Sequence, residues 1–257
     1  FKSWNDGELH SYLIGITAGI FREADDLADG ELIDRIKDSA KQKGTGRWAS
    51  IEALKQGVDI SMITSACTAR IMSNHLDERE KAWQLIHSPA VGLSPDKESF
   101  AAMVREALYT GKIIAYAQGF SLMQDASRLY GWNLDLGKIA SIFRAGCIIQ
   151  AVFLNDITHA FEAEPKPESL IFDGFFLSRI NEHQDSLRQA VSTGVMNGLP
   201  IPALCNAVSY LDEFRAKAAG ANLIQAQRDC FGAHTYERTD REGVFHHEWR
   251  WANDNQH

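Results

Sequence analysis

Apolar residues recur at helical intervals along almost the whole chain. Phe100, Met103, Val104 and Ala107 follow one another at spacings of three, one and three residues, so they share one face of a helix. Strict alternation of apolar and polar residues, the pattern of a half-buried strand, never continues beyond about five residues. These patterns predict an all-α fold without a sheet of three or more strands.

The longest predicted helices lie in the C-terminal two thirds of the chain. The first spans residues 99–130, with Ser99 or Asp96 as its N-cap and Gly131 after its last turn. The second, residues 136–163, is apolar on nearly every side and is expected in the middle of the domain. The other expected helices cover residues 167–196, two segments after the Pro200–Pro202 turn, and about 6–21, 32–40, 50–56, 60–72 and 78–86.

Length and charge limit the class of protein. At roughly 150 residues per domain, 257 residues form one large domain or two small ones. We expect a helical domain over residues 1–237 and a tail over 238–257. Twenty-six basic and 34 acidic residues give a net charge of −8, which argues against a broad nucleic-acid or anionic-membrane surface.

The cysteines and the longest uncharged run favour an intracellular, non-membrane protein. None of the four cysteines belongs to a CxxC pair, so we expect small buried hydrophobes in a reducing, cytoplasmic compartment. Residues 189–211 carry no charge, but Pro200 and Pro202 predict two helical pieces around a turn rather than a membrane span.

A first candidate binding stretch is KGTGRW, residues 43–48. Glycines on both sides of Thr45 free the backbone to approach a ligand, and Lys43 adds positive charge. The N-terminus of a helix starting at Ser50 would also favour an anion. The motif is no P-loop, and a plain glycine turn with a solvated lysine is the alternative.

A second candidate stretch is NLIQAQRDCFGAHTYE, residues 222–237. It gathers amide, guanidinium and imidazole groups around a glycine, and Arg228 suits bidentate binding of a carboxylate or phosphate. His234 can donate a hydrogen bond or change charge near neutral pH. The alternative is that Arg228 pairs with Asp229 or another carboxylate and that His234 is a capped surface residue.

Other candidates have weaker patterns. Arg70 either pairs with the acidic residues of the run 77–80 or reaches into a cleft. Arg144 is expected to be a buried ion-pair partner. The run His246-His247-Glu248 has no third ligand at a fitting spacing, so no metal site is predicted, and without GxSxG no nucleophilic hydrolase is predicted either.

Both candidate stretches resemble the C-terminal domain of the decarboxylating 6-phosphogluconate dehydrogenase family. FKSWNDGELHSYLIGIT, KIIAYAQGFSLMQ, GWNLDLGKIA and FRAGCIIQAVF are similar to that family as well, so the resemblance extends from Phe1 to about Trp249. It implies an enzyme that oxidises 6-phosphogluconate and decarboxylates it to ribulose 5-phosphate, with NADP (or NAD) held by a separate Rossmann domain. By this resemblance Lys43, Thr45 and Arg70 bind the substrate, and Arg228 and His234 complete the site from the other subunit of a homodimer.

The chain also departs from the family pattern. It contains no GxGxxG motif, and the family's catalytic base Lys and acid Glu precede the position of Phe1, so the chain alone is expected to be inactive. A repeated Trp-Asn pair, at Trp4 and Trp132, likewise suggests a missing long helix upstream. Cys230 replaces an aromatic residue, Gln150 a basic one, and residues 250–257 lack the family's glycine-rich end.

Two other functions stay open from the sequence alone. The chain could be a non-enzymatic helical dimerisation remnant, or the domain of a sibling 3-hydroxyacid dehydrogenase whose substrate has no phosphate. The joint match of the five substrate-binding positions disfavours the sibling enzyme.

Overall fold

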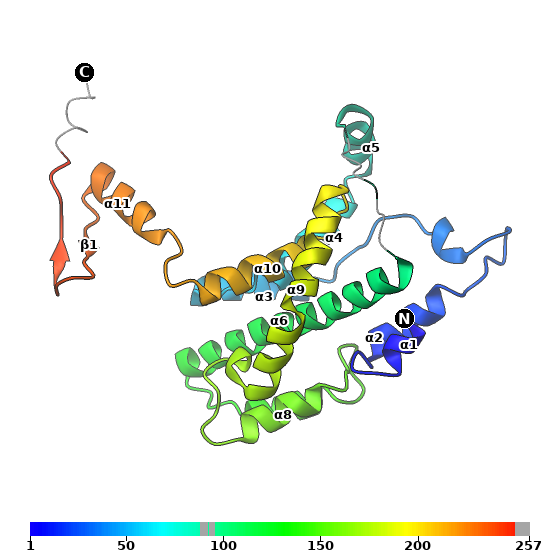
Figure 1. The fold of residues 1–257 in the computed structure, drawn as a ribbon, viewed down its shortest axis with the longest axis horizontal. Coiled ribbons are helices and arrows are strands. Elements are labelled where there is room, and N and C mark those ends of the chain that lie inside the picture. Colours follow the sequence, from blue (N-terminus) through cyan, green and yellow to red (C-terminus); the bar gives the residue numbers. More distant parts are fainter. Residues whose placement is uncertain (88–91, 93–95, 250–257) are drawn as a thin grey trace. The chain divides into compact units, whose positions relative to one another are not determined.

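The computed structural model describes residues 1–87, 92 and 96–249, and it is almost entirely helical (Figure 1). The helices are α1 (Lys2–Asn5), α2 (Tyr12–Ile20), η1 (Leu32–Arg35), α3 (Thr45–Gln56), α4 (Ser61–Ser73), α5 (Leu76–Leu85), α6 (Lys97–Tyr130), α7 (Leu136–Ile142), α8 (Leu154–Glu162), η2 (Leu170–Phe172), α9 (Gly174–Met196), α10 (Pro202–Arg215) and α11 (Ala221–Gly232). Within the described residues the only sheet is an antiparallel pair of two-residue strands, β1 (Tyr236–Glu237) and β2 (Val244–Phe245). The predicted all-α class is confirmed.

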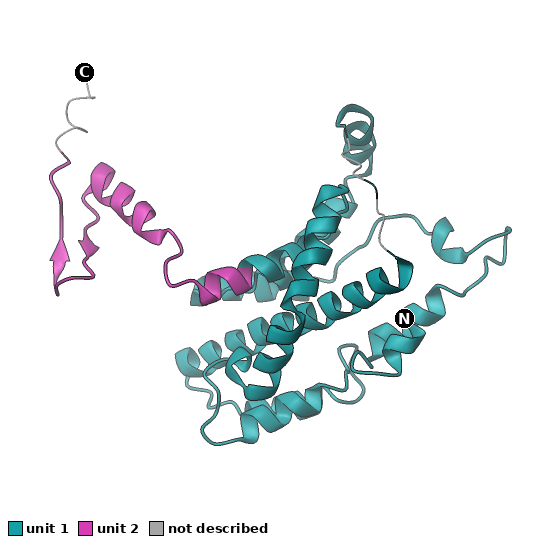
Figure 2. Ribbon diagram, viewed as in Figure 1, with its two compact units in different colours: residues 1–209 teal, residues 210–257 magenta. Residues whose placement is uncertain are grey.

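The chain forms two compact units, Phe1–Ser209 and Tyr210–His257 (Figure 2). The first contains everything up to most of α10, and the second contains α11 and the strand pair. Residues 250–257, the end of the predicted tail, lie outside the described residues.

Helix α6 is the centre of the first unit (Figure 1). It packs most extensively along α9, while α7 packs against α8, and α3 and α4 pack on each other and on α6. Its middle turns are buried on several sides, with Ile113 and Ile114 fully inaccessible and Gln118 buried beside them. We expected the 136–163 segment to hold this central place, and that prediction was wrong because α6 occupies it.

Local capping signals were predicted correctly at both ends of α6. The Asp96 carboxylate accepts a hydrogen bond from Ser99 N at 2.9 Å, and Gly131 follows the last turn with a left-handed φ of 64°. The uncharged run also divides as expected, since α9 ends at Met196 and α10 begins at Pro202.

One tertiary contact changes two of the predicted helices. The expected helix 6–21 begins only at Tyr12, as α2, and the expected helix 136–163 is divided into α7 and α8. Tyr12 N donates to Gln150 O at 3.0 Å, and Val152 N donates to His10 O at 3.0 Å, which makes an antiparallel bridge between the start of α2 and the segment that joins α7 to α8. These backbone groups bond across the fold, so they are not available for helical bonding along the chain.

The predicted helix 32–40 is also shorter than expected. Only η1 forms, and the chain then runs extended because polar side chains near the end of α4 hold it. Ala40 N donates to Ser73 Oγ at 2.9 Å, and Asn74 Nδ2 donates to Ala40 O at 3.2 Å. The predicted helix 167–196 begins later than expected, as α9, with Asp173 as its N-cap. The residues before Asp173 form the short turn η2 instead.

The cysteine prediction was partly wrong. All four cysteines are free thiols, but each is half-buried rather than fully buried. Within the described ranges, none of the helices has the length and apolar character that a bilayer crossing requires.

Candidate functional site

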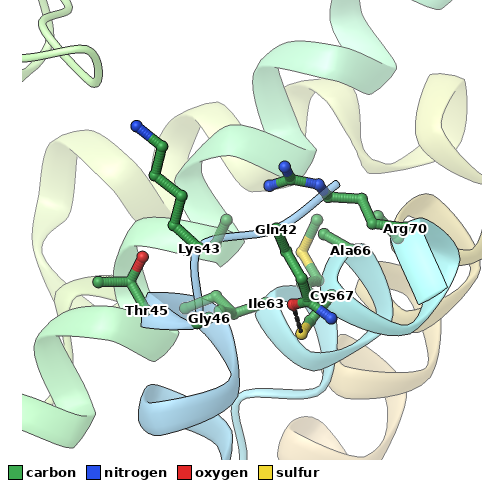
Figure 3. Close-up of a pocket in the computed structure, with 12 residues that line it drawn as sticks. Gln42, Lys43, Thr45, Gly46, Ile63, Ala66, Cys67 and Arg70 are labelled. Carbon is green, nitrogen blue, oxygen red and sulfur yellow. Dashed lines mark hydrogen bonds between the residues drawn. The ribbon is translucent and has the colours of Figure 1, made fainter. Parts of the chain in front are cut away.

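A pocket of about 370 Å³ in the first unit collects three of the predicted site residues. Lys43 lies on the loop that leads into α3, Thr45 is the first residue of α3, and Arg70 lies on α4 (Figure 3). Gln42 and Cys67 lie between them, joined by a hydrogen bond of 3.0 Å from the thiol to the amide oxygen. None of the twelve described residues that line the pocket carries a carboxylate, so its charge is positive in an acidic chain.

The glycines of the KGTG stretch start a helix. Gly44 is the N-cap of α3, and its φ of 103° is a conformation that favours glycine. We expected this helix to begin at Ser50, but α3 begins at Thr45. The first turn of a helix has backbone N–H groups without intrahelical acceptors, and its dipole favours anions. Thr45 and Gly46 therefore present this positive end directly at the pocket.

Helix α4, which carries Arg70, is fixed by a buried amide on α6. The N-cap residue of α4 makes no side-chain hydrogen bond to the free N–H groups of the first turn. Gln118 on α6 makes these contacts instead: its Oε1 accepts from Met62 N at 3.1 Å, and its Nε2 donates to Ser61 Oγ at 3.1 Å. Between α3 and α4 a Ser50–Thr64 hydroxyl contact spans 3.0 Å. Gln118 thus ties α4 to α6, and the hydroxyl contact ties α4 to α3.

Arg70 reaches the pocket rather than the acidic run. Its guanidinium donates to the carbonyl of Lys41, on the chain that leads to Lys43. Residues of the run 77–80 have other partners: Glu78 lies 2.8 Å from His75 Nδ1, and Arg79 pairs with Asp38 at 2.6 Å. The cleft alternative for Arg70 is therefore confirmed, and the ion-pair alternative is wrong.

Arg228 and His234 belong to the second unit and form a separate group. Both side chains are exposed, Arg228 on α11 and His234 in the turn that follows. Arg228 Nη1 donates to Gln225 Oε1 at 3.0 Å, so the proposed pairing with Asp229 does not occur. His234 lies edge-on to Phe231, with 5.9 Å between the ring centroids.

Asp229, which the sequence analysis did not single out, is the buried centre of this unit. Its side chain is completely inaccessible. Oδ1 accepts from Thr235 N at 3.0 Å and from His246 Nδ1 at 2.8 Å, and Oδ2 accepts from His247 N at 3.0 Å and Trp249 Nε1 at 2.9 Å. Burial alone would raise the pKa of Asp229, but these hydrogen bonds outweigh it and the pKa falls.

The structure also places two further candidates of the sequence, Arg144 and the run 246–248. Arg144 is exposed and donates to Asn155 Oδ1 at 3.0 Å and to Ser141 O at 3.3 Å, so the buried ion pair expected for it is wrong. His246 and His247 both bond Asp229, as described above. In the part of the chain that the structure describes, no three His, Cys, Asp or Glu side chains are grouped to hold a metal ion.

The family model described as "6-phosphogluconate dehydrogenase, C-terminal domain" matches residues 1–249. Decarboxylating 6-phosphogluconate dehydrogenases of Lactococcus lactis subsp. lactis (strain IL1403) and Staphylococcus aureus (strain N315) are 47% and 48% identical over 249 residues. These alignments cover 97% of this chain and 53% of each relative, so the chain spans about half the length of its relatives.

A solved structure agrees with these sequence matches. The 6-phosphogluconate dehydrogenase of Plasmodium falciparum, described in its apo form and in complexes with its cofactor NADP+ and its substrate 6-phosphogluconate, superposes with a TM-score of 0.93. It is 41% identical and is matched over 96% of this chain and 54% of its own. With the helical fold and the match over residues 1–249, the chain belongs to the 6-phosphogluconate dehydrogenase family and corresponds to its C-terminal domain.

Proposed function

We propose that this chain is the substrate-binding and dimerisation domain of an NADP-dependent (or NAD-dependent) enzyme that oxidatively decarboxylates 6-phosphogluconate. The observation that carries the proposal is the pocket at the start of α3, where Lys43, Thr45 and Arg70 meet without a carboxylate. A phosphorylated sugar acid has two anionic groups and several hydroxyls, and these side chains supply cations together with a hydroxyl. Family membership and the names of the relatives support the same substrate.

The chemistry assigned to this chain is binding and orientation. Charge-assisted hydrogen bonds contribute roughly 1.5–3 kcal/mol each, so a few of them fix a small anion firmly. Lys43 and Arg70 approach from different elements, and the first turn of α3 adds oriented N–H groups. We assign the catalytic base Lys and acid Glu of the family to the part of the relatives' length that this chain does not span.

The described residues do not fit a dinucleotide cofactor. A pyrophosphate-binding turn joins a strand of a parallel sheet to a helix, and the described strands form only a two-stranded antiparallel pair. We therefore assign the nicotinamide cofactor mainly to the half of the relatives' length that this chain does not span, and we derive no step through it.

The homodimer is supported by apolar side chains that the single chain leaves exposed. Ile142, at the end of α7, is 69% exposed, and Ile148 in the following loop is 63% exposed. On α2, Tyr12 is 51% and Ile20 is 43% exposed. An isologous interface would cover such residues. In the proposed dimer, Arg228 and His234 complete the partner subunit's site.

The direct test is an assay of the full-length protein and its Lys43→Ala and Arg70→Ala variants. We expect reduction of NADP with 6-phosphogluconate, and in each variant a rise in the KM for 6-phosphogluconate of at least about tenfold. The KM for the nicotinamide cofactor should stay unchanged. Lys41→Ala is the matched control, since this exposed lysine is not among the pocket-lining residues. No turnover of 6-phosphogluconate by the full-length protein would contradict the proposal.

The alternatives give different results in the same assay. A dimerisation remnant has no dehydrogenase activity, and a sibling enzyme oxidises a 3-hydroxyacid without phosphate more efficiently than 6-phosphogluconate. The shared site is tested by mixing Arg70→Ala subunits with Arg228→Ala subunits. Each mixed dimer then has one intact site, so about half the activity per dimer should return. Verified mixed dimers without recovery would show that both residues serve one subunit's site.

A further inference from the structure

The turn that carries His234 adopts an unusual backbone. Ala233 and Thr235, on either side of it, have φ of 49° and 60°, which non-glycine residues rarely adopt. Three hydrogen bonds hold the turn to α11. Ala233 N donates to Asp229 O at 2.8 Å, Thr235 N donates to Asp229 Oδ1 at 3.0 Å, and Gln225 Nε2 donates to Thr235 O at 2.5 Å. Asp229 makes two of these three bonds.

Asp229 also ties the end of the described chain to the same point. His247 N and the indole of Trp249 both donate to Oδ2, and His246 Nδ1 donates to Oδ1. A carboxylate can only accept, so the hydrogen of His246 lies on Nδ1. With Thr235 N included, all four donors to the Asp229 side chain come from residues 6 to 20 positions further along the chain.

The hydrogen bonds of Asp229 determine which groups are available to pair with the Arg228 guanidinium. A neighbouring free carboxylate would compete with an external anion for the guanidinium. The Asp229 carboxylate is instead fully engaged by other donors, and the described partner of Arg228 is the neutral amide of Gln225. The guanidinium charge therefore stays uncompensated at an exposed position next to the turn that carries His234.

We propose that Asp229 is a positioning residue for anion binding: its hydrogen bonds fix Arg228 and His234 as one preformed unit and keep its own charge from occupying the arginine. The inference rests on the proposed function, which assigns Arg228 and His234 to the 6-phosphogluconate site of the partner subunit, and the phosphate is the substrate group that we expect them to bind. Asp229 itself does not touch the substrate in this proposal.

The test is Asp229→Asn in the full-length enzyme. Asparagine keeps the size of the side chain but presents an amide N–H₂ to donors that need an acceptor. We expect the KM for 6-phosphogluconate to rise about tenfold with kcat changed much less, and the inhibition constant of inorganic phosphate to rise in parallel. Asp240→Asn is the matched control, because Asp240 is an exposed acidic residue in the same unit that pairs with Arg238 rather than with the Asp229 network.

A variant cycle separates positioning from general damage. In an Arg228→Ala, His234→Ala background, Asp229→Asn should raise the KM for 6-phosphogluconate by less than about twofold, because the side chains that it positions are already gone. A further tenfold loss in that background would overturn the proposal. So would an unchanged KM in the single Asp229→Asn variant while Arg228→Ala raises the KM, and in that case the proposed function would stand.

The proposed function fails differently. If Arg228→Ala and His234→Ala leave the KM for 6-phosphogluconate unchanged, both the assignment of the site and the role of Asp229 are overturned. Should Asp229→Asn not fold, Trp249→Phe and His246→Ala each remove one donor from the same carboxylate. Each is then expected to raise the same KM, by a smaller factor, and an unchanged KM in both would overturn the proposal.

Discussion

The two compact units fix their geometry by different means. In Phe1–Ser209 the interior is apolar, and rings such as Phe120, Phe153 and Phe176 are at most 2% exposed. The second unit buries Tyr210 and Leu211 at the end of α10, but between residues 216 and 249 the only described buried side chain is a carboxylate, that of Asp229. Apolar packing is strong but without direction, whereas a carboxylate with four donors sets direction closely and tolerates little change. The part with the less apolar interior therefore depends on a few specific bonds.

The largest expected effect comes from the apolar interior of the first unit. Leu187 on α9 is fully buried and Leu54 on α3 is 83% exposed, so they form a matched pair. Leu187→Ala should lower the free energy of unfolding by about 2–5 kcal/mol, and Leu54→Ala by less than about 0.5 kcal/mol. Urea denaturation followed by circular dichroism measures both. Similar losses would show that the first unit has no close-packed interior.

The next effect concerns a charge inside that same apolar unit. Lys112 on α6 lies with Nζ 5.2 Å from the centroid of the Phe153 ring, and burial lowers its pKa to about 8 from 10.5. Between those values the unfolded chain binds more protons than the folded one, so stability should rise with pH in that window.

Lys112→Met keeps the length of the side chain and removes the charge. It should raise the free energy of unfolding at pH 7 by about 1–3 kcal/mol, with the lost cation–π contact as a partial offset. The rise in stability between pH 8 and 10.5 should disappear as well. Thermal unfolding of both proteins across that pH range is the measurement, and a destabilised variant at pH 7 would contradict this account.

A pH experiment tests whether the hydrogen bonds of Asp229 hold the second unit together. The folded pKa of Asp229 is below its unfolded value of about 3.9, so its stabilising contribution is fully present above about pH 4 and is lost as the pH falls through the folded pKa. The Trp249 indole N–H should therefore stay protected from hydrogen exchange between pH 7 and 5. Loss of protection within that interval would mean that the carboxylate does not hold the segment.

The smallest effect on the free energy of unfolding is expected for an exposed aspartate, Asp38, in contrast to the buried Asp229. Asp38 pairs with Arg79 at 2.6 Å, but its side chain is 81% exposed. Asp38→Asn should change the free energy of unfolding by less than about 1 kcal/mol, and added salt should reduce that difference further. A loss as large as that of Leu187→Ala would show that this ion pair does more than an ordinary surface pair.

Helix content and most capping signals could be predicted from local sequence. The period of the apolar residues around Ala107, the N-cap Asp96 and the terminal Gly131 involve residues within a few positions of one another, so a linear pattern contains them. The same holds for the division of the uncharged run at Pro202. The residue pattern also singled out Lys43, Thr45 and Arg70, the resemblance added their substrate-binding role, and the structure places them around one pocket.

The errors share one physical cause, which is bonding between distant segments. The late start of the predicted helix 6–21 and the break in the predicted helix 136–163 are stabilised by backbone bonds between residues 10–12 and 150–152, about 140 positions apart. The extended chain at Ala40 depends on Ser73 and Asn74 in the same way. Helical propensity is a weak preference, and such tertiary bonds outweigh it.

By itself, then, the sequence determined the helical class, the ends of the longest helix and the residue types available for binding an anion. Only the tertiary structure decided that α6 rather than the more apolar 136–163 segment is central, and that Gln118 serves as the cap of α4. It also decided that the Asp229 carboxylate accepts hydrogen bonds from donors up to 20 positions away, so that it does not neutralise the charge of the Arg228 guanidinium. Periodicity records which face of a helix is buried, but the partner of a polar group is set by whichever distant segment folds against it.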